Sequence, residues 1–389
     1  MDRLKAEAFG LFFSLSAYSG RKYKGGFALK ERISIIRVMK YAGAYIAFEI
    51  GSGFATGQEI LQFYTSYGTM GIAGAIVSMI LFSWAGGSLM KIGHRVGEKA
   101  AEKPYQLFCG KILGTFYEYF VLFYLFAVLA VMISGAGASL SEYCGVSYYV
   151  GGLIMALLVF GAFAFGLDKL IDIVGLMGPL IIGFSVFIAI CTITANFGDL
   201  MAGNVDVEFL QNARPAQNWW FSGILYVAYN TVSSVAFLMA LGRDAKSERE
   251  AAAGGIAGGV LLMITVIFMN LALTSRLDLA ESSIVPSLKL AENVSSAAGT
   301  VFVCIMICGI FSTAAPVLWS ICNGLARPKS KASLIIAFLV SADSFILGQL
   351  PFDKLVAFIY PFTGYLGIIL LFCVFRWQIG HRKNTVQRN

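Results

Sequence analysis

The sequence predicts an all-α membrane protein with about ten transmembrane helices that divide into two halves of five. Three observations indicate this fold class. Hydrophobic residues make up 58% of the chain and charged residues only 13%, about half the charged fraction of a soluble domain. Apolar stretches of roughly 20 residues, the length that crosses a bilayer, recur along the chain. Lysine and arginine are concentrated in alternate loops.

Each apolar stretch predicts one span. The spans are expected near residues 41–65, 69–90, 112–136, 147–166, 173–195, 218–241, 252–274, 297–323, 333–350 and 355–376. In the seventh, four glycines at helical spacing favour close packing against another helix: Gly254, Gly255, Gly258 and Gly259. Five spans per half is an odd number, so the second half is inverted relative to the first, as in inverted-repeat transporters. The two repeats are expected at about 38–197 and 217–378.

The basic residues predict the orientation. Nearly all of them lie in the N-terminal tail, in four alternate loops and in the C-terminal tail, whereas the opposite loops contain only Arg214, Arg276, Lys289 and Lys354. Because basic loops stay on the cytoplasmic side, both termini are expected there. We expect a cytoplasmic extension over 1–37, one domain over 38–378 and a cytoplasmic tail over 379–389. The extension could also reflect an upstream start, with Met39 as the true one.

Composition also argues against other classes of protein. The net charge of +7 is accounted for by basic cytoplasmic loops, so the expected partners are the bilayer and a small solute, not nucleic acid. The sequence contains no GxxxxGK[ST] phosphate loop. His94 and His381 are distant in sequence from any cluster with metal-ligand spacing. We therefore expect neither an enzyme nor a bound cofactor, and the sequence leaves protein partners open.

The first span is interrupted by Gly51-Ser52-Gly53. A helix in lipid must satisfy its own backbone groups, so an interruption needs protein or a polar cavity around it. Glu49 precedes the interruption and Glu59 follows it, and carboxylates at this depth are typical of transport pathways. Gly51, Ser52 and Gly53 are therefore predicted to bind substrate. The alternative is that these small residues only let a neighbouring helix approach closely.

Two further residues are predicted at the substrate site. If the halves are related by inversion, the sixth span is also interrupted, near Asn230, although no glycine lies there. An amide in mid-membrane is costly unless it is used, which makes Asn230 a candidate ligand. Tyr124, near the middle of the third span, could reach the same site or could serve aromatic packing.

A second polar group lies in the eighth span. Gly309, Ser312 and Thr313 share one helix face, because they are spaced by three and four residues. Pro316 has no N–H, so the carbonyl of Ser312 lacks its helical donor. These oxygens suit a small cation such as Na⁺. The alternative is that both hydroxyls bond to the preceding turn of their own helix.

The chain resembles the YkvI family of bacterial membrane proteins, which is grouped with the amino acid–polyamine–cation superfamily of LeuT fold. The resemblance is carried by the run from Gly51 to Ile60, by Tyr229-Asn230 and by Tyr360-Pro361, and it covers about residues 40–376. It implies a multi-pass protein of the bacterial plasma membrane. It also implies a Na⁺ site between the first and eighth spans, where the carbonyls of Ala47 and Ile50 would complete the set from Gly309, Ser312 and Thr313.

The predicted function is ion-coupled transport of a small organic solute by alternating access. By resemblance alone, that solute is an amino acid or a related compound. Glu49 departs from the family pattern and could carry a proton, so Na⁺ and H⁺ both stay open as the coupling ion. A channel, or a sensor or accessory protein that binds solute without moving it, is the alternative.

Overall fold

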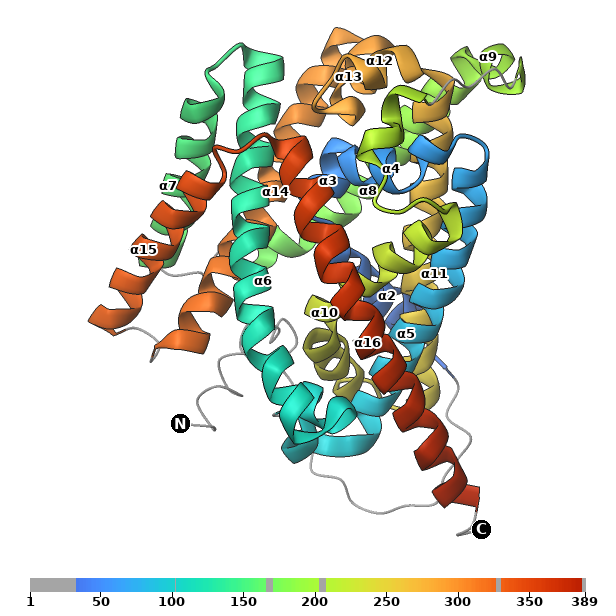
Figure 1. Ribbon diagram of the computed structural model, residues 1–389, viewed down its shortest axis with the longest axis vertical. Helices are drawn as coiled ribbons and strands as arrows, with labels where there is room; N and C mark the ends of the chain where they lie inside the picture. The colour runs from blue at the N-terminus through green and yellow to red at the C-terminus, as the bar shows by residue number, and fades with distance from the viewer. Residues whose placement is uncertain (1–32, 102, 166–170, 203–207, 327–329, 387–389) are drawn as a thin grey trace.

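The computed structural model describes residues 33–101, 103–165, 171–202, 208–326 and 330–386, and within them the chain is helical and contains no strand (Figure 1). The elements are α2 (Ile35–Glu49), α3 (Ser52–Thr56), α4 (Gln58–Phe63), η1 (Thr65–Tyr67), α5 (Met70–Ala101), α6 (Pro104–Cys144), α7 (Tyr148–Phe165), α8 (Ile171–Ala195), α9 (Phe197–Ala202), η2 (Glu208–Ala213), α10 (Trp219–Arg243), α11 (Glu248–Ser275), α12 (Leu277–Glu281), α13 (Pro286–Val294), α14 (Ser296–Leu325), α15 (Lys331–Leu347) and α16 (Phe352–Val386). The predicted extension over 1–37 lies largely outside these residues.

Among the described residues, eight helices are long and apolar enough to cross a membrane. They are α5, α6, α7, α8, α10, α11, α14 and α16. The two remaining predicted spans, the first and the ninth, correspond to shorter helices: α2 has 15 residues and α15 has 17. The all-helical, multi-pass architecture predicted from composition is therefore confirmed at the level of these eight spans.

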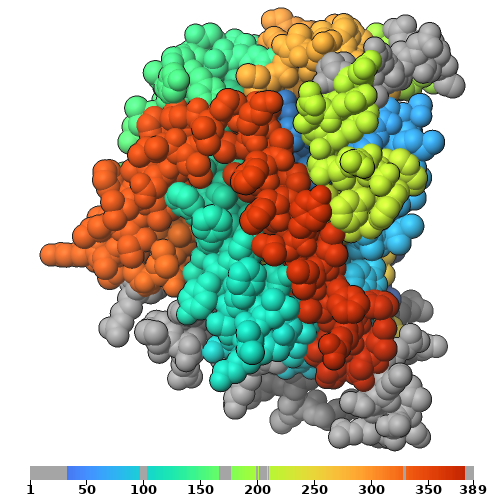
Figure 2. All heavy atoms as spheres, viewed as in Figure 1, coloured from blue at the N-terminus to red at the C-terminus, as the bar shows by residue number. Residues whose placement is uncertain are grey.

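The outer edge of the bundle is formed by α7 and α15, which pack side by side (Figure 1). In the space-filling view these two helices project from the rest of the molecule (Figure 2). Large apolar side chains on them are exposed, including Leu157, Phe165, Ile335 and Phe338. Water would not favour such a surface, whereas lipid tails would cover it without cost.

The centre of the bundle depends on close contact between α5 and α11. A Cβ atom at Gly255 would lie 2.3 Å from the carbonyl carbon of Gly86, so only glycine permits this approach. A Cβ atom added at any of the other three glycines of the group would likewise lie less than 3 Å from an atom of α2 or α5. The prediction that these glycines serve close helix packing is confirmed.

We expect Gly255→Ala to lower the melting temperature of the detergent-purified protein. The added methyl meets backbone atoms that cannot move aside, and overpacking of this kind costs about 1–3 kcal/mol. Gly161→Ala in α7 is the matched control, because a Cβ there meets nothing within 4 Å. An unchanged melting temperature in Gly255→Ala would contradict the tight α5–α11 contact.

Candidate functional site

The helix that begins at Ile35 ends at Glu49, and the chain is extended for two residues before α3 begins. The N–H of Ile50 donates to the Ile46 carbonyl at 3.1 Å, and the next helical bond starts anew from Ala55 to Gly51, also at 3.1 Å. Carbonyls in the last turn of a helix have no donor further along the chain. The interruption therefore presents backbone oxygens to their surroundings.

A second interruption follows at Gly57, which separates α3 from α4. Its φ is +85°, a left-handed conformation that favours glycine. A Cβ at this position would also lie 2.4 Å from the hydroxyl oxygen of Ser287. This turn was not predicted from the sequence, although a glycine after an apolar turn is a common helix end and offered the signal.

The predicted interruption of the sixth span is wrong. α10 is continuous from Trp219 to Arg243. Thr231 and Asn230 satisfy this helix instead of breaking it: the Thr231 hydroxyl donates to the Val227 carbonyl at 2.7 Å, and the Asn230 amide donates to the Tyr226 carbonyl at 3.0 Å. No glycine lies at this point to favour a break in the helix, and the polar side chains bond to carbonyls of the preceding turn.

A cavity of about 740 Å³ begins at the first interruption. Eight predicted site residues line it: Ala47, Glu49, Ile50, Gly51, Tyr124, Asn230, Ser312 and Thr313. At its other end it is lined by Lys40, Asp244 and Lys246, which are exposed. The cavity therefore runs from the centre of the bundle to one surface, between α2, α6, α8, α10 and α14.

Three predicted site residues do not line this cavity: Ser52, Gly53 and Gly309. Ser52 is fully buried in α3, and its Cβ lies 3.0 Å from the position that a Cβ on Gly135 of α6 would occupy. At Gly53, a Cβ would lie 2.2 Å from Oε1 of Glu59. Gly53 thus makes room for a carboxylate and has no place on the cavity wall.

Glu59 lies in the cavity, although it is not among the site residues predicted from the sequence. Its side chain is 3% exposed and lines the cavity wall, and the Tyr226 hydroxyl donates to its Oε2 at 3.3 Å. Around it lie stacked tyrosines: the rings of Tyr229 and Tyr360 are parallel within 8°, with centroids 4.6 Å apart. The two turns at Ile50–Gly51 and Gly57 bring Glu59 back toward the centre, which a straight helix would not do.

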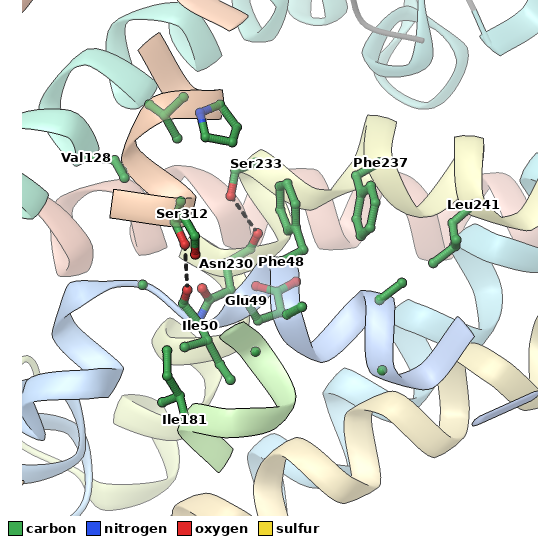
Figure 3. A pocket seen from close by; sticks show the side chains of 18 of the residues that line it. Phe48, Glu49, Ile50, Val128, Ile181, Asn230, Ser233, Phe237, Leu241 and Ser312 are labelled. Carbon is green, nitrogen blue, oxygen red and sulfur yellow. Dashed lines mark hydrogen bonds between the residues drawn. The ribbon is translucent and has the colours of Figure 1, made fainter. Parts of the chain in front are cut away.

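Glu49 is the second carboxylate of the cavity. It ends α2, is 7% exposed, and its Oε1 makes no hydrogen bond within the described part of the chain. Figure 3 shows its carboxylate between α2 and α10, near Asn230. Beside it Phe48 and Phe237 stack with centroids 4.5 Å apart. An ionisable group with an unused oxygen on the wall of a mostly apolar cavity is available to a ligand.

The predicted ion-site oxygens gather where α2 meets α14. Thr313 Oγ1 lies 3.3 Å from the Ile50 carbonyl oxygen and 3.3 Å from that of Gly309, and one of the dashed lines in Figure 3 marks the bond to Ile50. Ser312 Oγ donates to the Gly309 carbonyl at 2.8 Å. The alternative prediction, that both hydroxyls bond to their own helix, is therefore also met. Gly309 has no side chain and can contribute only its carbonyl; the Ile181 side chain occupies the space that a Cβ on Gly309 would need.

Comparison with curated proteins finds two relatives in Bacillus subtilis (strain 168). The chain is 26% identical over 331 residues to the uncharacterized membrane protein YkvI, which covers 85% of this chain and 93% of YkvI. It is 23% identical over 344 residues to the uncharacterized protein YyaD, covering 88% of this chain and 97% of YyaD. No family model matches the chain.

Solved structures are similar over most of the chain. An inward-facing conformation of Mhp1 aligns with a TM-score of 0.55 at 14% identity, covering 87% of this chain and 75% of Mhp1. A Na⁺-coupled sialic acid symporter, solved substrate-bound and outward-open, aligns with a TM-score of 0.58 at 13% identity, covering 95% and 82%. Likeness at this identity establishes the fold. The chain is a homologue of the membrane protein YkvI and of the protein YyaD, and it has the LeuT fold.

Proposed function

We propose that the protein is an ion-coupled secondary transporter that moves a small organic solute by alternating access. The observation that carries this proposal is the cavity, which ends at an interrupted helix lined by two buried carboxylates and opens at one surface. Interrupted helices at mid-membrane are where transporters bind solutes and coupling ions. The similarity to a Na⁺-coupled symporter supports the same class.

We further propose ten spans in two inverted repeats, with α2–α4 and α15 as the first and ninth. The packing of the helices supports this arrangement. When each helix is replaced by its equivalent in the other repeat, five spans away, the same pairs of helices are found in contact. α2 packs on α11 as α10 packs on α5, α2 packs on α8 as α10 packs on α16, and α6 packs on α16 as α14 packs on α8. Such a pattern is expected of two related halves. The continuous α10 is the departure from it.

The ion would be held where α2 meets α14. The donor set is entirely oxygen, with the carbonyls of Ile50 and Gly309 beside the hydroxyls of Ser312 and Thr313, and hard cations prefer such ligands. Ala47 lies one turn before the interruption and lines the same cavity. A cation there joins α2 to α14, so a conformation that separates these helices binds the cation less well, and the ion shifts the population accordingly.

In this conformation the cavity is closed at the end where α12 and α13 lie. The Gln58 amide donates to the Ile284 carbonyl at 3.0 Å, and the Gln62 amide donates to the Asp353 carbonyl at 3.0 Å and to the Gln58 side chain at 3.1 Å. These bonds connect α4 to the segments before α13 and at the start of α16. With the basic loops on the cytoplasmic side, the open end faces the cytoplasm, and we propose an inward-facing state.

We expect Gln58→Ala/Gln62→Ala to loosen the closed end. Each lost hydrogen bond is worth about 1 kcal/mol, so the amides of residues 52–63 should exchange roughly fivefold faster per bond. Hydrogen exchange followed by mass spectrometry measures this directly. Gln349→Ala is the control, because the Gln349 amide, in the turn after α15, bonds only to the Phe345 carbonyl in the last turn of that helix. Unchanged exchange over 52–63 would show that these bonds do not close the cavity.

Transport itself is tested with the purified protein in proteoliposomes. A panel of radiolabelled amino acids and aliphatic amines is added outside under an inward Na⁺ gradient, an inward H⁺ gradient or no gradient. The proposal expects saturable accumulation above the external concentration under one of the two gradients. Equilibration that never exceeds the external concentration would indicate a channel. Binding of a panel member without any uptake would indicate a sensor.

A further inference from the structure

We infer that the cavity recognises its solute by an ammonium group, which lies against Glu59 and the stacked aromatic pair of Tyr229 and Tyr360. The solute is thus an organic cation, and a carboxylate on it is dispensable. This inference rests on the proposed transport function for the role of the site, but not on which ion drives transport. It follows from the charges, the unused polar atoms and the aromatic wall of the cavity.

The cationic side chains of the cavity lie toward its open end, together with Asp244, whereas the charged groups of the enclosed part are carboxylates. Glu49 and Glu59 lie in the enclosed part, where they are 7% and 3% exposed. The cationic side chains of the lining, Arg37, Lys40 and Lys246, come from the first half of α2 and from the loop after α10. Of these, Arg37 already pairs with Glu250 at 2.7 Å. Buried carboxylates are usually paired, and a cationic solute is the partner that the enclosed part lacks.

Two atoms of the enclosed part are buried and unused. Oε1 of Glu49 and the hydroxyl of Tyr229 make no hydrogen bond of good geometry within the described residues, although Ser234 lies near the Glu49 carboxyl and Glu59 lies near the Tyr229 hydroxyl. Both side chains line the cavity. The Tyr229 residue is 2% exposed. A carboxylate oxygen only accepts hydrogen bonds, so its ligand must be a donor. An ammonium group supplies several donors on one positive centre, which fits the Glu49 oxygen as well as Glu59.

The wall beside Glu59 is aromatic. Tyr229 and Tyr360 stack face to face, and Tyr226 meets Tyr229 edge-on at 5.5 Å between centroids. Aromatic faces attract cations and repel anions. A free carboxylate on the solute would meet two buried carboxylates here. The amide end of α3 offers no counterweight, because α3 is only five residues long. The site therefore selects for positive charge.

The test uses four solutes with the same five-carbon chain: n-pentylamine, 1-pentanol, pentanoate and 5-aminopentanoate. Binding to the full-length purified protein is measured by thermal shift and calorimetry. We expect n-pentylamine to bind at least about tenfold more tightly than 5-aminopentanoate, and the other two not to bind. Glu59→Gln should weaken the binding of n-pentylamine by about tenfold or more, because the substitution removes the charged partner of the ammonium group. Glu281→Gln, at an exposed carboxylate outside the cavity, should not.

A second pair of variants separates recognition from folding. Tyr360→Phe keeps the ring and should retain n-pentylamine binding, whereas Tyr360→Leu removes the aromatic face and should weaken it. Tighter binding of pentanoate or 5-aminopentanoate than of n-pentylamine, or no binding of n-pentylamine, would overturn the inference. Accumulation of labelled 5-aminopentanoate but not of 1,5-diaminopentane in proteoliposomes would also overturn it while leaving transport standing. Binding of n-pentylamine without accumulation of any solute would support the inference and contradict transport.

Discussion

Arg37→Met is expected to lower the melting temperature of the protein markedly, because it removes the guanidinium from a buried carboxylate. The Glu250 side chain is 2% exposed and accepts from Arg37 Nε at 2.8 Å on both oxygens. Removing one partner leaves a buried charge without compensation. Because Arg37 is itself one-third exposed, water relieves part of the loss, and we expect about 1–3 kcal/mol. Differential scanning fluorimetry in detergent measures the shift.

A double-mutant cycle is the control for this ion pair. Arg37→Met/Glu250→Gln removes the charge together with its partner, so it should recover much of the stability lost in Arg37→Met. Additive losses would show that the two side chains do not interact energetically. The pair joins the start of α2 to the start of α11 beside the open end of the cavity.

Composition and the recurring apolar stretches predicted the all-helical, multi-pass architecture, because both follow from the bilayer. Lipid requires long apolar helices with satisfied backbones, so eight spans are legible in the sequence. The first interruption was legible for the same reason, since Gly51 and Gly53 flank a serine in an apolar run. The exact position of the interruption was harder to predict from the sequence. The chain leaves the helix at Ile50, before the glycines, and the turn that only glycine favours falls at Gly57.

The contents of the site were harder to predict, because they depend on how the turns redirect the chain. Glu59 follows two interruptions, and its distance from the centre cannot be read from a straight helix. Gly53 was assigned to the solute, yet its missing side chain makes room for Glu59. The predicted interruption in the sixth span came from symmetry, which constrains topology but not hydrogen bonding. There Asn230 and Thr231 bond within α10 and keep it whole.

Ser312→Ala/Thr313→Ala is expected to abolish stabilisation of the protein by Na⁺ and Na⁺-driven accumulation of solute. In the parent protein, Na⁺ at about 100 times its dissociation constant should add about 2.7 kcal/mol of stability, because it binds the folded state. The variant removes two of the oxygens that gather at the α2–α14 contact. Melting temperatures in NaCl and in KCl at matched ionic strength measure the effect.

The matched control for this pair is Thr265→Ala in α11, whose hydroxyl also bonds to its own helix, at 3.1 Å to Leu261, but lies away from the cavity. It should respond to Na⁺ as the parent does. The alternative outcome is that Na⁺ does not stabilise the parent protein, and that uptake follows a proton gradient and is lost in Glu49→Gln. These results would assign the coupling to a proton carried by Glu49. The choice between the two ions depends on two neighbouring parts of α2: its last carbonyl oxygens, which suit Na⁺, and its last side chain, which can take up a proton.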